Sequence, residues 1–92
     1  MPTVKIPPVL RAHTSGASEV DAPGGTVGEV LRGLADAHPA TREQLFTPEG
    51  ELNRYVNVYV NDEDVRVLEG LETRVADADT VVILPAMAGG SE

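Results

Sequence analysis

The segment from Thr26 to Pro39 carries the strongest helix signal in this 92-residue chain and constrains the fold more than any other feature. Its apolar side chains follow the i, i+3, i+4, i+7 spacing, which places them in one stripe along a helix. These side chains are Val27, Val30, Leu31 and Leu34. Thr26 and Glu29 have capping-box spacing at the start, and Pro39 ends the helix. A lone helix cannot bury this stripe, so we expect the rest of the chain to form a sheet beneath it.

Two short segments before the helix predict a hairpin. Residues 4–6 alternate apolar and polar side chains, which is typical of a strand. Two prolines interrupt the pattern, and we expect the strand to resume at Val9 and Leu10. Residues 13–16 have turn composition, and residues 18–20 predict the returning strand.

The segments after the helix predict a short helical turn and three more strands. Residues 41–46 favour the helical turn, and residues 55–60 form the strongest strand pattern, with three valines on one face. After an acidic turn, residues 65–67 are expected to return antiparallel. Another turn at residues 77–79 leads into residues 80–84, a nearly continuous apolar run that predicts a central strand covered on one or both faces.

The expected order is therefore strand, strand, helix, strand, short strand, strand. We predict an α+β fold of the β-grasp (ubiquitin-like) type, in which one main helix covers a mixed sheet. The first and last strands are expected to pair at its centre, with the helix as their crossover. We assign residues 1–85 to this domain and residues 86–92 to a flexible C-terminal tail.

The composition and charge of the chain disfavour several classes of function. The net charge is −8, from 7 basic and 15 acidic side chains, which disfavours nucleic acids and anionic membranes as partners. Cysteine is absent, so the sequence offers no disulfide, thiolate nucleophile or thiolate metal site. We find no signal-peptide pattern and no 18-residue apolar run, and we expect a cytoplasmic protein.

The sequence contains no convincing catalytic or metal centre. His13 and His38 are the only histidines, and a structural or solvent-facing role is favoured for both. The acidic groups at residues 62–64 and 77–79 resemble parts of a calcium loop but lack its glycine and final glutamate, which favours solvated turns. We therefore expect no metal and no cofactor held by this chain.

The C-terminal tail is the one segment with a chemical use. Gly89 and Gly90 follow the last predicted strand, and glycine permits close backbone approach and any backbone conformation. An α-carboxylate on such a tail can enter a narrow active site of another protein and attack the α-phosphate of ATP. The alternative is that this segment has no function and is a frayed chain end.

The sequence resembles the ubiquitin-like sulfur carriers, the family of the molybdopterin synthase small subunit and the thiamine sulfur carrier. The resemblance rests on residues 57–64, Leu71 and residues 77–90, which end in the Gly-Gly pair, and it extends over essentially the whole chain. Residues 6–11, 54–66 and 83–86 are most similar to the carrier of cysteine biosynthesis.

This resemblance implies a protein co-substrate that is not itself an enzyme. An E1-like activating enzyme would adenylate Gly90 with ATP and Mg²⁺, and a sulfurtransferase activity would convert it to a thiocarboxylate. The acceptor would be a cysteine synthase-like enzyme that uses pyridoxal phosphate, or an enzyme of thiosugar, molybdopterin or thiamine synthesis. Gly89 gives the reacting carbonyl room, and the segment that enters the partner's active site comprises Ala86, Met87 and Ala88.

We assign possible docking roles to Arg11, Phe46 and Tyr59, although a surface or core position without special role is favoured for each. The sequence departs from the family pattern at its end, where Ser91 and Glu92 follow Gly90. The resemblance implies that a zinc metalloprotease of the deubiquitinase type removes them.

Two other functions remain open. A ubiquitin-like modifier would join target lysines through the same activated glycine, so only the product distinguishes it from a sulfur carrier. Lys5 is the only lysine, which argues weakly against chains of such modifiers. A β-grasp interaction subunit with an inert tail is the third possibility, and it would keep its function when truncated at Ala88.

Overall fold

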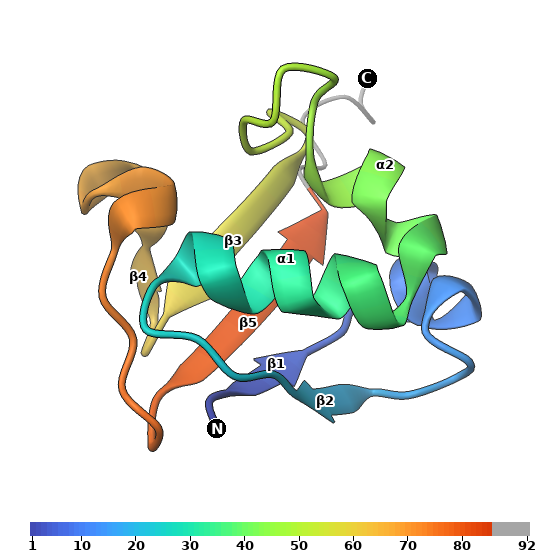
Figure 1. The fold of residues 1–92 in the computed structure, drawn as a ribbon, viewed down its shortest axis with the longest axis horizontal. Coiled ribbons are helices and arrows are strands. Elements are labelled where there is room, and N and C mark those ends of the chain that lie inside the picture. Colours follow the sequence, from blue (N-terminus) through green and yellow to red (C-terminus); the bar gives the residue numbers. More distant parts are fainter. Residues whose placement is uncertain (86–92) are drawn as a thin grey trace.

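One mixed sheet carries a single long helix across one face (Figure 1). The computed structural model describes residues 1–85. The strands are β1 (Thr3–Lys5), β2 (Glu19–Asp21), β3 (Val56–Val60), β4 (Glu63–Asp64) and β5 (Thr80–Pro85). The helices are α1 (Val27–Ala37) and α2 (Arg42–Leu45), and the 3-10 turns are η1 (Pro8–His13), η2 (Pro39–Thr41), η3 (Val65–Val67) and η4 (Gly70–Glu72).

The strand order across the sheet is β2-β1-β5-β3-β4. β1 and β5 are parallel neighbours, with Val4 opposite Val81, and the other neighbouring pairs are antiparallel. The α1 crossover connects the β1–β2 hairpin to the other half of the sheet, as Figure 1 shows. This confirms the predicted β-grasp topology and the central pairing of the first and last strands.

The ends of α1 follow from the residues that predicted them. The Thr26 hydroxyl accepts a hydrogen bond from the Glu29 amide at 3.2 Å, and the Glu29 carboxylate accepts one from the Gly25 amide at 2.7 Å. The carboxylate thus reaches one residue further back than in a standard capping box. His38 caps the other end outside the helical conformation, with φ −133° and ψ 80°, just before Pro39.

The core lies between α1 and the face of the sheet beneath it. The apolar stripe of α1 is 0–1% exposed, and alternate residues of β3 and β5 oppose it. The largest fully buried apolar side chains are Leu31, Leu34, Leu45, Ile83, Val4, Val27, Val30, Val58, Val65 and Val81. Each such side chain contributes about 1.5–3 kcal/mol when removed from water. Within residues 1–85, none of the helices combines the length and apolar character needed to span a membrane.

Two predicted strand segments are wrong. Val9 and Leu10 belong to η1, because Pro8 suits the first position of a helical turn and the Leu10 amide donates to the Pro7 carbonyl at 2.9 Å. Residues 65–67 form η3. The returning strand is only β4, because the Asp64 carboxylate accepts from the Arg66 amide at 2.8 Å and starts the turn there.

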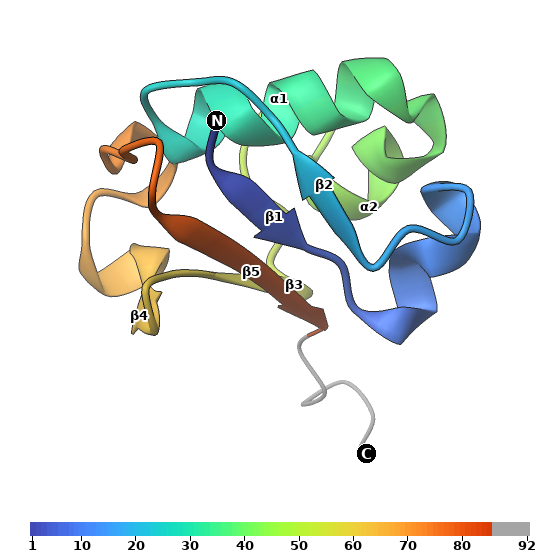
Figure 2. The same cartoon turned by 90° about the horizontal axis from the view of Figure 1, so that it is seen from below.

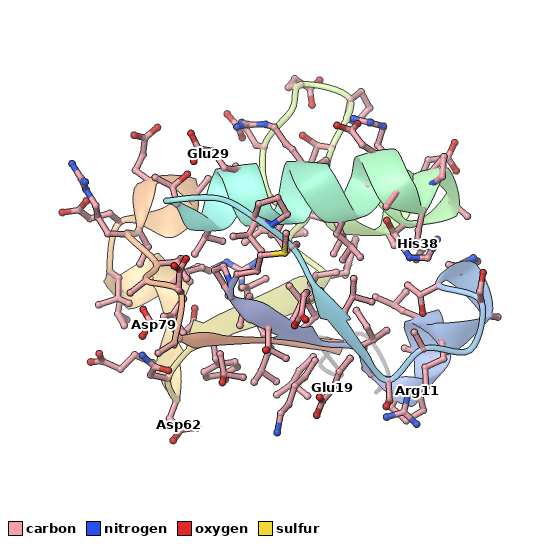
Figure 3. The ribbon with its side chains drawn as sticks, turned by 60° about the horizontal axis from the view of Figure 1, so that its bottom comes forward. Arg11, Glu19, Glu29, His38, Asp62 and Asp79 are labelled. Atoms are coloured by element: carbon pink, nitrogen blue, oxygen red, sulfur yellow. The ribbon has the colours of Figure 1, made fainter. Side chains whose placement is uncertain are left out.

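The predicted turn at residues 77–79 is confirmed and sets the start of β5. The Asp79 carboxylate accepts hydrogen bonds from the Ala76 amide at 2.8 Å and from Asn61 Nδ2 at 2.9 Å. Asn61 Oδ1 in turn accepts from the Thr80 amide at 3.2 Å. Figure 3 shows Asp79 at the same end of the sheet as Asp62, which follows β3. The turns that end β3 and begin β5 are therefore joined through side chains.

These hydrogen bonds make a prediction about acid stability. The hydrogen bond from the Ala76 amide, followed by the one from Asn61, lowers the pKa of Asp79 below the usual value for an aspartate. A carboxyl whose pKa is lower in the folded state stabilises the fold above its unfolded pKa, and this contribution is lost as pH falls through the folded pKa. Asp79→Asn should therefore reduce the free energy of unfolding at neutral pH, with the deficit shrinking below pH 3.8.

Urea denaturation from neutral pH down to acid measures this deficit. Asp77→Asn is the matched control, because Asp77 is exposed and, within residues 1–85, its carboxylate forms an ion pair only with the N-terminal ammonium, at 3.6 Å. Parallel pH curves for the wild type and Asp79→Asn would contradict the assignment.

Two glycines on α1 make a second prediction. A Cβ at Gly33 would meet only the Pro23 carbonyl oxygen at 3.8 Å, whereas one at Gly28 would lie 3.1 Å from the Leu71 carbonyl oxygen. Gly33→Ala should therefore raise the free energy of unfolding by about 0.5–1 kcal/mol through helix propensity alone. Gly28→Ala should be less stable than Gly33→Ala by about 1 kcal/mol, because η4 must move away. Equal stabilisation in thermal unfolding would show that α1 and η4 are not in close contact.

Candidate functional site

The C-terminal end of β5 leads out of the sheet. β1 pairs with β5 only as far as Val82, opposite Lys5. Beyond that point β5 pairs with β3 alone, with Leu84 opposite Asn57 and Pro85 opposite Val56. Figure 2 shows this end of β5 at the lower edge of the domain, with α1 and α2 on the far side of the sheet. We call residues 83–85 and their partners in β3 the β5 exit.

Arg66 holds the start of β3, the only strand that the β5 exit pairs with. Its guanidinium donates to Asn57 Oδ1 at 2.8 Å, to the Val56 carbonyl at 2.8 Å and to the Asn53 carbonyl at 3.1 Å. Hydrogen bonds from a charged donor are stronger than neutral ones. The side chain of a residue just after β4 therefore fixes the position from which the tail departs.

The sheet face opposite α1 presents apolar side chains beside the β5 exit. Val82 and Tyr59 are half-buried and lie opposite one another, and Leu84 is 43% exposed. The apolar run of β5 is thus covered by α1 on one face, while no described helix covers the other (Figure 2). Exposed apolar patches of this kind mark protein contacts. The apolar run at residues 80–84 predicted the strand. The sequence pattern could not show that one face of that strand is uncovered.

The three predicted docking residues lie in separate places. Arg11 lies in η1, half-buried, with its Nε donating to the Ile6 carbonyl at 3.2 Å, and Figure 3 shows it at the opposite end of the sheet from Asp79. Phe46 follows α2 and is 8% exposed, so most of its ring belongs to the core. Tyr59 lies on the open face. Their docking role stays a prediction, but the fold does not gather them into one patch.

Two hollows share Tyr55, the residue just before β3, and the smaller of them is also lined by residues of the β5 exit. The larger, of about 810 Å³, lies between α1, α2 and the loop before β3, and is lined by Arg32, Arg42, Arg54, Phe46 and Tyr55 among others. The smaller, of about 180 Å³, lies between η1 and the exit and is lined by Leu10, Val56 and Ile83, again with Tyr55. Neither was apparent in the sequence, because their residues come from segments far apart in the chain.

Metal-ligating residues do not gather within residues 1–85, where no group of three or more His, Cys, Asp or Glu side chains is placed to hold an ion. His13 lies in η1, and His38 caps α1. The predicted reactive residues Gly89 and Gly90 lie outside the described residues. So do the segment Ala86, Met87 and Ala88, and the residues Ser91 and Glu92.

The β-grasp domain, with its central last strand followed in the sequence by a Gly-Gly pair, places the chain in the class of ubiquitin-like proteins. The ThiS family model matches residues 4–90, and the chain belongs to that family. This confirms the resemblance found in the sequence.

The similarity to known proteins covers nearly the whole chain. Sulfur carrier protein CysO of Mycobacterium tuberculosis is 51% identical over 90 residues, which cover 96% of this chain and 97% of the relative. The crystal structure of the Amycolatopsis orientalis BexX/CysO complex contains a chain that is 49% identical, with a TM-score of 0.89 and coverage of 98% and 100%. Small archaeal modifier protein 1 of Methanosarcina acetivorans is 35% identical, with a TM-score of 0.85 and coverage of 96% and 94%.

The Arg66 contacts make a prediction about the β5 exit. Arg66→Ala removes three hydrogen bonds from a charged donor, although the Asn53 carbonyl still accepts from the Val56 amide at 3.1 Å, and the loss should cost about 1–3 kcal/mol. Hydrogen exchange should accelerate at residues 56–58 and 83–84 more than in α1. Arg74→Ala is the matched control, because Arg74 is exposed and makes no side-chain hydrogen bond within residues 1–85. Equal exchange in the two variants would show that Arg66 does not hold the exit.

Proposed function

We propose that this protein is a sulfur carrier whose Gly90 carries sulfur as a thiocarboxylate. The observation that carries the proposal is the 51% identity with sulfur carrier protein CysO over nearly the full length of both chains. The path of β5 supports it, because the strand ends at the edge of the sheet, four residues before Gly89 in the sequence. The chain is then a co-substrate, and the catalytic groups belong to its partner enzymes.

The proposed chemistry proceeds in two steps on the partner. A carboxylate oxygen of Gly90 attacks the α-phosphorus of ATP, with Mg²⁺ on the phosphates, and pyrophosphate leaves. A sulfide equivalent then attacks the carbonyl carbon of the acyl-adenylate, AMP leaves, and a thiocarboxylate remains. An α-carboxylate is ionised at neutral pH, since its pKa is about 3.5, and is therefore ready to attack. An E1-like enzyme with sulfurtransferase activity is the partner that this requires.

The structure of residues 1–85 supports this role by giving a partner something to recognise. The open face with Val82, Leu84 and Tyr59 lies beside the β5 exit, so an enzyme that docks there receives the tail in its active site. The contacts of Asp79 hold the start of β5, and those of Arg66 hold the segment of β3 that pairs with its end. The domain thereby fixes where the tail begins relative to the docked face.

Maturation requires a cut between Gly90 and Ser91. In the chain as written, Gly90 is held in a peptide bond and has no carboxylate to adenylate. Hydrolysis of that bond adds one water, releases the Ser-Glu dipeptide and creates the α-carboxylate. We propose a zinc metalloprotease of the deubiquitinase type for this step.

The acceptor is proposed from the relatives. Similarity to CysO favours cysteine synthesis, through a cysteine synthase-like enzyme with pyridoxal phosphate. The A. orientalis relative forms a complex with BexX, which supports transfer through a direct carrier–enzyme complex. A thiosugar synthase-like enzyme, or one of molybdopterin or thiamine synthesis, could accept sulfur from the same tail, so one carrier can serve several acceptors.

A protein modifier is the second candidate, because small archaeal modifier protein 1 is 35% identical and shares the fold. Its chemistry begins with the same adenylate but ends in an amide bond to a lysine. The product therefore distinguishes the two functions. An inert interaction subunit, the third possibility, would yield neither product.

Intact mass spectrometry tests the proposal. The full chain is incubated in an extract of its own cells with ATP and a sulfide source. We expect loss of the Ser-Glu dipeptide, followed by replacement of one oxygen by sulfur. Attachment of this chain to other proteins, seen as an increase in their mass, would favour the modifier. An unchanged mass of this chain would favour the inert subunit.

Gly90→Ala is the variant that separates chemistry from folding. A methyl group on the terminal residue should obstruct a channel shaped for glycine and reduce the charging rate by at least about a hundredfold, a barrier increase of about 2.7 kcal/mol. The unfolding midpoint should be unchanged, because Gly90 lies beyond the core of residues 1–85. Normal charging of this variant would contradict the assignment of Gly90.

A further inference from the structure

Three arginines line the larger hollow, which we call the arginine groove. Arg32 comes from α1, Arg42 from α2, and Arg54 from the loop before β3. The whole chain has only seven Lys and Arg residues and a net charge of −8. Nearly half of its cations therefore converge on one groove of an otherwise acidic protein.

The charges in the arginine groove are only partly compensated. Arg42 forms an ion pair with Asp36 at 2.8 Å. Within residues 1–85, the side chains of Arg32 and Arg54 form neither an ion pair nor a hydrogen bond. Among the described residues, Glu43 is the only carboxylate that lines the groove. The groove thus offers two free guanidinium groups, the donors best suited to pairing with carboxylates.

The arginine groove also has apolar walls. Phe46, Pro48 and Tyr55 line it, and Tyr55 is 62% exposed. A volume of about 810 Å³ accommodates several side chains of a partner. Its occupant therefore combines carboxylates with apolar groups, as an acidic peptide segment does. A nucleic acid is disfavoured, because the net charge of −8 repels an extended phosphate backbone.

The position of the arginine groove identifies the kind of partner. Tyr55 lines both the groove and the smaller hollow, which Ile83 also lines. The next residue, Val56, pairs with Pro85, where the described chain ends. Whatever fills the groove thus lies one residue from the β5 exit. An enzyme that takes up the tail must cover this region.

We propose that the arginine groove binds an acidic, partly apolar segment of the enzyme that activates Gly90. This inference rests on the proposed function, and it adds a docking surface on the helical side of the sheet. A partner with a basic surface is attracted by most of this acidic protein, and that attraction alone sets no orientation. An acidic segment that fits only the arginine groove sets the orientation, because it is repelled elsewhere.

The test measures charging of a chain that ends at Gly90, in the same extract with ATP and sulfide. Arg54→Glu and Arg32→Glu should each slow the initial rate of thiocarboxylate formation by about tenfold. Arg54→Lys, which keeps the charge, should retain most of the rate. Increasing salt should slow the wild type more than Arg54→Glu, which a purely structural role would not produce.

Arg74→Glu is the matched control, because it changes the net charge equally at an exposed position that does not line the groove. If Arg54→Glu and Arg74→Glu are charged at the same rate in an extract that charges the wild type, the groove proposal is wrong. The proposed function is not affected by that result. An extract that charges no form, although it charges an authentic relative, overturns the proposed function itself. Thermal unfolding of each variant verifies that the domain is folded.

The chain's own acidic end is the competing occupant. The sequence has no cysteine, so Ser91→Cys gives a single site for a nitroxide label in the full chain. We expect no salt-sensitive broadening of the amide signals of Arg32 and Arg54 in the free protein. Such broadening would show that the tail fills the groove and would overturn the proposal of a partner segment.

Discussion

The parallel pairing of β1 with β5 beneath α1 is the constraint on which the rest of the structure depends. Only one long helix is available to cover the sheet, so it must cross from one half to the other. A right-handed crossover then places the last strand beside the first. Val4 and Val81 meet at this pairing, and both are fully buried. The strand that precedes the proposed reactive tail is consequently the central strand of the sheet.

Both ends of β5 are held by contacts that involve side chains of other segments. At its start, Asp79 and Asn61 join the turns that flank β3 and β5. At its end, Arg66 holds the segment of β3 with which the strand pairs. This arrangement gives a partner a fixed geometry between the docked domain and the first residue of the tail. A core made of valine, leucine and alanine, with almost no aromatic side chains, suffices for this purpose.

The distribution of charge complements this geometry. An acidic surface attracts a basic partner over long distances but does not determine which way round the two proteins meet. The apolar open face provides contact area, and the arginine groove adds a group of three arginines on the helical side of the sheet. In the proposed function, the complexes form and dissociate at each sulfur transfer. Such transient complexes need a defined orientation of the two proteins more than a large apolar interface, which would slow their dissociation.

The sequence by itself determined the elements whose signals are local. The capping pair and stripe of α1, the valine face of β3 and the turn before β5 all follow from neighbouring residues, and each was predicted correctly. The two errors are also local: Pro8 starts a helical turn where a strand was expected, and the Asp64 side chain starts η3. The resemblance to sulfur carriers, carried by residues 57–64 and 77–90, identified the family before the fold was known.

Only the tertiary structure decided which surfaces surround the β5 exit. Arg66 reaches residues 9–13 positions away in the chain, and the arginine groove joins three arginines that share no periodic spacing. No pattern along the chain encodes such groupings, because they depend on how the connecting loops place separate elements. The open face of β5 was hidden for a similar reason. Val82 and Leu84 are as apolar as their buried neighbours, and only the absence of a helix on their side of the described domain leaves them available to a partner.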